Sequence, residues 1–422
     1  MRNERTEYVE ILQKILNANI PLSFFKDTIP DIQKSFFNML FLTTFRQLTF
    51  IKQTVLPHFI KKKIPEKQNV LNYVFYLAVT ELLFLDTPDY AVINSYVDIA
   101  KKYTDKFGAS FVNAVLRNIL RQKSDLLLIH NNSYFSPEFL KILKSDYTKN
   151  EILQMERFVA VEPALDITLK KSAINPFNDG VVLPSGSIRL PARTKVSELP
   201  FYNDGIWWVQ DAAAALAVNS LTNLKDKYVL DLCAAPGGKT AQLLDKGALV
   251  TAVDISEERL ETLKINMERL NLTENLTVVC SDALEFSSSR KFDIVLIDAP
   301  CSAIGTFRRH PEIIHTKTCQ DVLQQTKLQK DILNHAISLL TPNGQIIYAT
   351  CSLAKSEGEK QINDFLNSHP DFAILPLSIP GTDNMRTNEG YLRILPQSFI
   401  VNDRPDLSGA DGFFIAHLQR KI

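Results

Sequence analysis

Two of the five cysteines in this 422-residue sequence follow directly on apolar stretches that are typical of buried β-strands. Cys301 lies just after Asp298 in the segment FDIVLIDAPCSAIGT, and Cys351 lies in the segment IIYATCSLAKSEGE. A cysteine is often only a small buried hydrophobic residue, and this interpretation suits the other three. Cysteines at two strand ends, one of them beside a carboxyl group, instead favour a chemical role, because a parallel sheet presents functional residues at the carboxyl ends of its strands.

Methylation of cytosine at C5 is a reaction that uses two thiols and a carboxyl group. The C5 atom is not nucleophilic enough to attack a sulfonium methyl group, but a thiolate that adds to C6 turns the ring into an enamine-like nucleophile. A nearby carboxyl group can hydrogen-bond or protonate N3, and a base must remove the C5 proton before the thiol leaves. The residues therefore predict a covalent mechanism that uses Cys301, Cys351 and Asp298, without assigning the two thiols to their roles.

A glycine-containing loop lies earlier, in the segment LDLCAAPGGKTAQLL, between a predicted strand and a predicted helix. Gly237 and Gly238 would let a ligand approach the backbone amides at the helix N-terminus. Three interpretations compete. A P-loop has the pattern G-x-x-x-x-G-K-[ST], but Cys233 takes the place of the first glycine, and the G-x-G-x-x-G pattern of a dinucleotide fold is absent. The third interpretation is the nucleoside-binding loop of a methyltransferase.

The strand after this loop ends in an acid, Asp254, which lies 17 residues after Gly237. A carboxylate at that place can accept hydrogen bonds from ribose hydroxyls, although by itself it is as well explained as a helix cap before Ser256. The glycine loop in front of it favours the ribose interpretation. Asp282 ends the third strand on the same edge, where it could contact an adenine amino group or cap a helix.

Three regions of the chain differ in pattern and predict a multi-domain protein. Residues 1–145 predict an all-α bundle, because segments such as 68–85 are apolar around most of a helix. Residues 146–204 contain several Pro and Gly residues with short strand-like pieces, which indicates a small α+β module or a linker. Residues 205–422 alternate strands and helices, which predicts an α/β Rossmann-like domain with a mostly parallel sheet.

Composition limits where the protein acts. No apolar run approaches the ~18 to 20 residues needed to cross a bilayer. The first residues lack the pattern of a signal peptide, and the cysteines lack the spacing of a disulfide framework. The sequence has no C-x-x-C pair and no His/Cys cluster with zinc spacing. We therefore expect a cytoplasmic protein with no membrane segment and no metal, and we expect a monomer.

Charge is unevenly distributed between the two parts of the chain. Residues 1–145 carry 19 Lys and Arg against 13 Asp and Glu, a net charge of +6, and the remainder carries 28 against 34, a net charge of −6. The basic part favours a polyanionic partner, although a mixed solvated surface explains it equally well. The overall neutrality argues against strong non-specific binding to RNA.

Taken together, these motifs resemble the RsmB (Fmu/Sun) family of 16S ribosomal RNA cytosine-C5 methyltransferases, which belongs to the NOL1/NOP2/Sun group. The resemblance rests on LDLCAAPGGKT, VDIS, DAPCS, RRHPEI, YATCS and DGFFIAHL, and on VQD at residues 209–211. The N-terminal stretch FVNAVLRNILR is similar to the NusB-like RNA-binding domain of this subfamily. That domain favours the ribosomal RNA enzymes over the transfer-RNA enzymes of the group.

The resemblance implies roles that the spacing leaves open. Cys351 would be the nucleophile, Cys301 would assist product release, and Asp298 would contact the cytosine. The methyl donor would be S-adenosylmethionine, bound by Asp298 and by a set of loop and strand-end residues: Cys233, Ala234, Ala235, Pro236, Gly237, Gly238, Lys239, Asp254 and Asp282. One departure lies close to this set, since Ala303 replaces a glycine that is frequent in the family.

Other functions remain open at this point. The same chemistry could act on transfer RNA or another RNA, because the RNA sequence cannot be deduced from the protein. A catalytically silent, NusB-like RNA-binding protein is a different class of function, and the intact Asp298, Cys301 and Cys351 argue against it. A P-loop nucleotidase is disfavoured by Cys233 and by the lack of a suitably placed second acid for magnesium.

Overall fold

The computed structural model describes residues 4–130, 133–192 and 195–421, and the chain divides into two compact units. The first unit contains Met1–Lys144 and His310–Thr318, and the second contains Ser145–Arg309 and Cys319–Ile422. Residues 146–204, which the sequence separates as a module, lie within the second unit. The boundaries at residues 145 and 204 stay a prediction.

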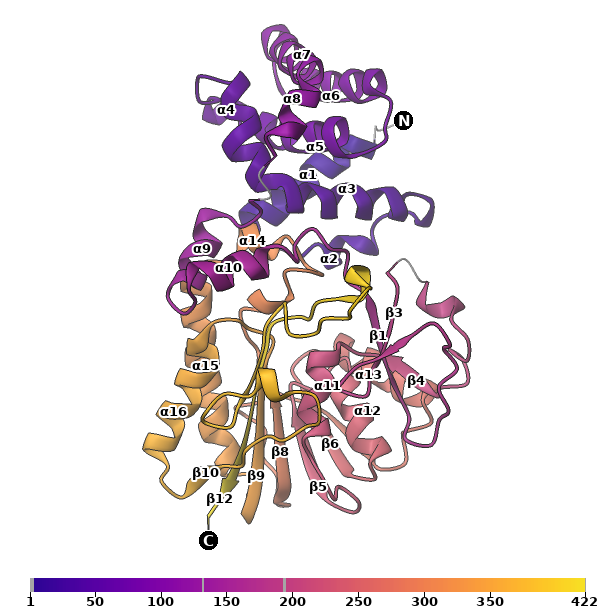
Figure 1. The fold of residues 1–422 in the computed structure, drawn as a ribbon, viewed down its shortest axis with the longest axis vertical. Helices are drawn as coiled ribbons and strands as arrows, with labels where there is room; N and C mark the ends of the chain where they lie inside the picture. The colour runs from indigo at the N-terminus through magenta and orange to yellow at the C-terminus, as the bar shows by residue number, and fades with distance from the viewer. Residues whose placement is uncertain (1–3, 131–132, 193–194, 422) are drawn as a thin grey trace. The chain divides into compact units, whose positions relative to one another are not determined.

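The described part of the first unit is helical (Figure 1). Its central helix α5 (Val70–Phe84) is apolar and buried on most sides, as its sequence predicts. Asp105 caps the N-terminus of α7 by accepting a hydrogen bond from the Gly108 backbone N–H at 2.9 Å. The helices are α1 (Glu4–Ala18), α2 (Ser23–Lys26), α3 (Asp31–Phe50), α4 (Leu56–Phe59), α5, α6 (Asp89–Tyr103), α7 (Lys106–Arg121), α8 (Lys123–Leu128), α9 (Pro137–Lys144) and α14 (Ile313–Thr316).

A small antiparallel sheet begins the second unit after helix α10 (Lys149–Glu156). Its strand order is β2-β3-β1-β4. Asp166 and Arg189 form an ion pair at 2.6 Å between neighbouring strands, with both side chains almost fully buried. The strands are β1 (Leu165–Leu169), β2 (Val181–Val182), β3 (Ile188–Leu190) and β4 (Trp207–Val209).

The main sheet of the second unit has the strand order β10-β12-β9-β8-β5-β6-β7, and β11 pairs with β12. The chain runs from β5 outward through β6 to β7 and then returns to β8 on the other side of β5, so a topological switch point lies between β5 and β8. Strands β5 to β9 are parallel, whereas β12 is antiparallel to β9. The strands are β5 (Tyr228–Leu232), β6 (Leu249–Asp254), β7 (Leu276–Cys280), β8 (Phe292–Asp298), β9 (Leu340–Thr350), β10 (Phe372–Ile374), β11 (Leu392–Ile394) and β12 (Phe413–Arg420).

Helices cover both faces of this sheet (Figure 1). Alternate residues of a strand face opposite sides, so Val229 and Ile294 pack in one core and Leu230 and Val295 in the other. The first core includes α11 (Ala212–Asn219), α12 (Gly238–Asp245) and α13 (Glu257–Arg269), and the second includes α15 (Cys319–Ile337) and α16 (Glu359–Ser368). The predicted fold class, a helical N-terminal region followed by an α/β domain with a mostly parallel sheet, is confirmed. No helix among the described residues is both long and apolar enough to cross a membrane.

Candidate active site

The parallel strands bring the predicted residues to one edge of the sheet. Asp254 ends β6, and Asp298 ends β8 opposite Ala349 of β9 in register. Cys351 follows one residue after the end of β9. Because these strands run in the same direction, their carboxyl ends form a single rim, and segments far apart in the sequence meet there.

The two thiols lie in contact at this rim. The Sγ atoms of Cys301 and Cys351 are 3.4 Å apart, although 50 residues separate them in the chain. Both cysteines are partly buried and unoxidised. The structure therefore brings together the pair that the sequence predicts.

Close backbone packing holds the loops that carry the thiols. The Gly305 N–H donates to the Cys351 carbonyl at 3.0 Å, and the Gly412 N–H donates to the Gly305 carbonyl at 2.8 Å. A Cβ atom on Gly305 would lie 2.0 Å from the Gly412 oxygen, so no other residue fits there. The three motifs DAPCS, YATCS and DGFF thus form one structural unit.

The pKa of two thiols in this region is raised, those of Cys301 and the loop cysteine Cys233. The hydrogen bond with Cys351, together with burial, raises the pKa of the Cys301 thiol well above its ordinary value. Burial, with neighbouring carboxylates, raises the pKa of the Cys233 thiol to about 12. The thiol of Cys233 keeps its proton near neutral pH, which agrees with its interpretation as a small buried residue.

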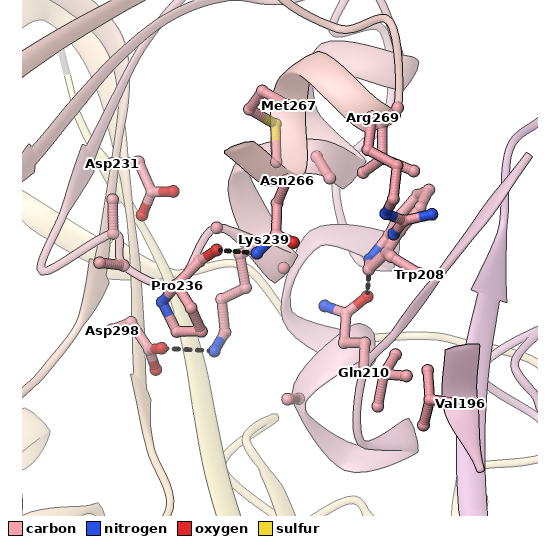
Figure 2. A pocket seen from close by; sticks show the side chains of 18 of the residues that line it. Val196, Trp208, Gln210, Asp231, Pro236, Lys239, Asn266, Met267, Arg269 and Asp298 are labelled. Atoms are coloured by element: carbon pink, nitrogen blue, oxygen red, sulfur yellow. Dashed lines mark hydrogen bonds and ion pairs between the residues drawn. The ribbon is translucent and has the colours of Figure 1, made fainter. Parts of the chain in front are cut away.

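A cavity of about 290 Å³ lies against the glycine loop (Figure 2). Trp208 and Gln210 form the side opposite Asp231 and Asp298, and Gln210 accepts a hydrogen bond from the Trp208 indole at 3.0 Å. The cavity is also lined by residues 234–239 of the loop and by Asn266, Met267 and Arg269 of α13. Its volume is at the lower end of the range for small-molecule sites.

Asp231 of β5 gives this cavity an acceptor for a cationic group. Its side chain is fully buried, and its Oδ2 accepts a hydrogen bond from Thr240 at 2.7 Å. Its Oδ1 has no hydrogen-bond partner among the described residues. Burial raises the pKa of this carboxyl to about 7. A ligand with an ammonium group would satisfy the open oxygen.

Lys239 links the glycine loop to the end of strand β8. Its Nζ forms an ion pair with Asp298 Oδ2, drawn as a dashed line in Figure 2, at a distance of 2.7 Å. The same Nζ lies 5.2 Å from the ring centre of Phe413. The lysine side chain is 9 % exposed and that of Asp298 is 36 % exposed, so the carboxylate is open to a ligand on its other side.

Three predicted cofactor residues do not line the cavity: Cys233, Asp254 and Asp282. Asp254 is buried and accepts hydrogen bonds at 3.1 Å from the backbone N–H groups of Ala235 and Ser256. Asp282 accepts one from the Leu284 N–H at 2.8 Å. The local interpretation of both acids, as caps of the turns that follow them, is thus present in the structure. Their contact with a cofactor stays a prediction.

The sequence analysis missed much of the cavity wall. Asp231 had a visible signal, since it is an acid inside an otherwise apolar strand. Asn266 and Met267 had none, because they belong to an amphipathic helix whose position depends on the packing of α13. Among the described residues, no group of three or more His, Cys, Asp or Glu side chains is placed to hold a metal.

Comparisons with known proteins place this chain in a family. A family model described as 16S rRNA methyltransferase RsmB/F matches residues 218–419, and the NusB family model matches residues 2–121. The ribosomal RNA small subunit methyltransferase B of Photorhabdus laumondii is 31% identical over 382 residues, which cover 85% of this chain and 84% of that protein. The chain belongs to the RsmB/F family. The enzyme of the same name from Proteus mirabilis is 30% identical over 398 residues, covering 87% of this chain and 92% of the relative.

Solved structures share the RsmB/F-type fold. A crystal structure of PH0851 has a TM-score of 0.73 and 23% sequence identity, and the match covers 93% of this chain and 92% of that one. A methyltransferase homologue from Pyrococcus horikoshii has a TM-score of 0.53 and 24% identity, with 68% of this chain and 99% of that chain covered. At these identities the likeness establishes the fold.

Family membership confirms the resemblance found in the sequence and, with it, the methyl donor. The protein is an RNA methyltransferase that uses S-adenosylmethionine. The residues present fit this donor, because its ammonium group matches the open oxygen of Asp231 and the cavity adjoins the glycine loop.

Proposed function

We propose that this enzyme methylates C5 of a cytosine in 16S ribosomal RNA through a covalent adduct between Cys351 and C6. The observation that carries the proposal is the pair of thiols in contact at the ends of the adjacent strands β8 and β9, with Asp298 on the same rim. A binding protein without catalysis has no use for two thiols 3.4 Å apart.

The state of Cys301 supports Cys351 as the nucleophile. Because hydrogen bonding to Cys351 and burial raise the pKa of Cys301, the Cys301 thiol keeps its proton in the resting enzyme. A protonated thiol is a poor nucleophile. Cys351 then attacks C6 as the thiolate, after its proton has passed to solvent. The electron pair of the C5–C6 double bond moves to C5, which would take the methyl group of the donor sulfonium, leaving the donor as a neutral thioether.

The same contact explains why Cys301 acts later. Once the Cys351 sulfur is bonded to C6, its hydrogen bond to Cys301 no longer holds the Cys301 proton in place, and the largest cause of the raised pKa is removed. Cys301 can then give its proton to solvent and, as a thiolate base, accept the proton from C5. The C5–C6 double bond re-forms as the Cys351–C6 bond breaks, and the methylated base is released.

Asp298 and Lys239 orient the base and support its charge. Asp298 stands at the end of β8, and the ion pair with Lys239 fixes one of its oxygens. The other oxygen is available to accept a hydrogen bond from the cytosine amino group, and a proton carried on it would pass to N3 as negative charge develops there during addition of the thiolate.

S-adenosylmethionine, when bound, supplies an electrophilic methyl group. We assign its binding to the loop Cys233–Lys239 together with Asp231, Asp254, Asp282 and Asp298. Asp231 would pair with its ammonium group, and the left-handed Gly237, with φ of 101°, lets the backbone approach it closely. A P-loop nucleotidase is not favoured, because Thr240 donates its hydroxyl to the buried Asp231 and is not free to hold a magnesium ion.

The substrate assignment follows the names of the relatives, which are ribosomal RNA small subunit methyltransferases. The NusB-family match at residues 2–121 supports an RNA partner. With such a substrate, we expect the enzyme to act in the cytoplasm. Transfer RNA, or another RNA, is the alternative substrate for the same chemistry.

Single cysteine variants test the mechanism. Cys301→Ala should methylate the base once and remain joined to it, because the adduct forms but cannot be resolved. Cys351→Ala and the double variant should form no adduct and transfer no methyl group. The measurement is a slow-migrating protein–RNA band on a denaturing gel after incubation with 16S RNA and S-adenosylmethionine.

Different results of these experiments would contradict different parts of the proposal: the roles of the thiols, the covalent mechanism or the substrate. A band with Cys351→Ala in place of Cys301→Ala would exchange the roles of the thiols. Full activity in both single variants would remove the covalent mechanism. Bisulfite sequencing of total RNA with and without the gene identifies the substrate, and a missing mark in transfer RNA would replace the ribosomal assignment.

A further inference from the structure

A third buried acid, Glu357, lies between the loops that carry the two thiols. It belongs to the short turn η5 (Lys355–Glu357), and its side chain is 0 % exposed. Its carboxylate accepts hydrogen bonds from both residues that directly follow the cysteines, Ser302 and Ser352. The mechanism proposed above gives no role to Glu357, Ser302 or Ser352.

The contacts on the Cys301 side fix the backbone before and after the thiol. The Ser302 N–H donates to Glu357 Oε1 at 2.8 Å, and the Ser302 hydroxyl lies against Oε2. Gln329 of α15 donates to Glu357 Oε1 at 3.0 Å and to the Pro300 carbonyl at 2.9 Å. Both neighbours of Cys301 in the chain are thus held by one carboxylate and one amide.

The contacts on the Cys351 side converge on the same carboxylate. The Ser352 hydroxyl donates to Glu357 Oε2 and lies 3.2 Å from the hydroxyl of Ser302. The Tyr348 hydroxyl, in the strand that leads to Cys351, donates to the Glu357 carbonyl at 3.0 Å. Arg393 donates to the Ser352 carbonyl at 2.6 Å and so holds the loop from its other side.

Four donors surround the carboxylate, two for each oxygen, which is the full capacity of the group. All four donors are neutral, so hydrogen bonds stabilise the negative charge of the carboxylate and no cation of the described residues is paired with it. The negative charge also adds to the larger effects of hydrogen bonding and burial that raise the pKa of Cys301. The carboxylate itself is fully satisfied, and it holds both loops in place because its donors would lose this acceptor if a loop moved. The Oε1 of Gln329 has no hydrogen-bond partner among the described residues.

We propose that Glu357 is a positioning residue that sets the distance between Cys301 and Cys351 by binding both thiol-bearing loops at once. It touches neither cofactor nor base. The inference rests on the proposed function for its catalytic meaning, whereas its geometric part, the spacing of the thiols, can be tested without RNA.

The test compares the wild-type chain with Glu357→Gln, which keeps the size of the side chain but puts an NH₂ group where a donor needs an acceptor. The matched control is Asp364→Asn, an exposed acid on the adjoining helix α16. The probe of spacing is phenylarsine oxide, which bridges two adjacent thiols. Its binding is measured as protection of the Cys301 and Cys351 peptides from iodoacetamide, by mass spectrometry.

We expect Glu357→Gln to need about tenfold more phenylarsine oxide for the same protection, and Asp364→Asn to match the wild type. In methyl-transfer assays, kcat of Glu357→Gln should fall about 10- to 100-fold, the size expected for a reacting group misplaced by about 1 Å. The KM for S-adenosylmethionine should stay unchanged, since Glu357 does not line the cofactor cavity.

A folded Glu357→Gln protein with wild-type protection and wild-type kcat would overturn the inference. If that variant does not fold, Ser302→Ala/Ser352→Ala takes its place, because it removes two donors and leaves the carboxylate. Wild-type protection in this double variant would then overturn the inference. The wild-type enzyme could methylate no RNA while Glu357→Gln still needs more phenylarsine oxide than the wild type. That outcome would refute the proposed function and leave the role of Glu357 in spacing the thiols intact.

Discussion

Two buried carboxylates near the carboxyl ends of the strands, those of Asp231 and Glu357, differ in how many hydrogen bonds they accept. On the cofactor side, Asp231 has one partner, Thr240, and an oxygen without a hydrogen bond among the described residues. On the thiol side, Glu357 accepts four hydrogen bonds and has no open position. Both side chains are fully buried, so burial alone does not distinguish them.

This difference in hydrogen bonding indicates which of the two carboxylates can accept a hydrogen bond from a ligand. An unsatisfied buried acceptor is costly and is found where something else will complete it. A fully satisfied one stabilises the protein and fixes the groups around it. We therefore expect a ligand group to complete the Oδ1 of Asp231, whereas the carboxylate of Glu357 has all its hydrogen bonds within the protein.

The largest expected effect is on stability, from Glu357→Ala. Gln329 would keep the Pro300 carbonyl, and the hydroxyls of Ser302 and Ser352 could still bond each other. The Ser302 N–H and one serine hydroxyl would lose their acceptor, at about 1 to 3 kcal/mol for each unsatisfied group, so we expect a loss of about 2 to 6 kcal/mol. Asp231→Ala orphans only the Thr240 hydroxyl and should cost clearly less. Urea unfolding of the two variants in parallel measures the difference. Equal losses would contradict the comparison.

The next effect is a pH dependence caused by Asp231. Its pKa is raised from 3.8 in the unfolded chain to about 7 in the folded protein, so between these values the folded protein holds a proton that the unfolded chain has released. Stability should therefore fall as pH rises from 4 to 7, by up to about 4 kcal/mol at about 1.4 kcal/mol per pKa unit, and level off above pH 7.

Asp231→Asn provides the reference for this effect, since it cannot titrate. The difference between the wild-type and Asp231→Asn unfolding free energies should follow the described curve, and two parallel curves would exclude it. S-adenosylmethionine should also bind the wild type more tightly at pH 8 than at pH 6, because its ammonium group requires the ionised carboxylate.

A smaller effect is expected for Asp254→Ala, which should weaken S-adenosylmethionine binding by about 1.5 to 3 kcal/mol, the scale for losing hydrogen bonds to a charged group. Calorimetry measures this change, with Asp364→Asn as the control. Unchanged affinity would mean that Asp254 only caps the turn at Ser256, as its contacts in the protein alone allow. Tight binding of ATP without binding of the methyl donor would contradict the site altogether.

The smallest effect concerns Ala303, in the turn after Cys301. This residue has φ of 59° and ψ of 18°, a left-handed conformation in which a Cβ atom is strained. Ala303→Gly should stabilise the protein by about 1 kcal/mol. Ala354, in the turn after Cys351, has φ of −67°, and Ala354→Gly should instead destabilise it. Thermal melts measure both changes. Melting temperatures that shift in the same direction in the two variants would show that backbone strain at Ala303 does not cause the change in stability.

Local pattern was enough to predict much of this protein. The alternation of strands and helices predicts the parallel sheet, and the cysteines at two strand ends predict the thiol pair, because strand direction alone decides which residues share an edge. The departure at Ala303 was also visible, since glycine is the residue that suits a left-handed turn.

The sequence by itself determined which residues are candidates for the chemistry, since thiols, a carboxyl group and a glycine loop occur at fixed points of a predictable alternation. Only the tertiary structure decided how these groups are held. Glu357 lies 55 residues from Ser302 and 28 from Gln329, and no periodicity links them. The wall of the cofactor cavity likewise joins β4, β5 and α13, and Asp254 is occupied by backbone amides of a neighbouring loop. Such contacts depend on the packing of separate elements against the sheet, which side-chain type and spacing along the chain do not encode.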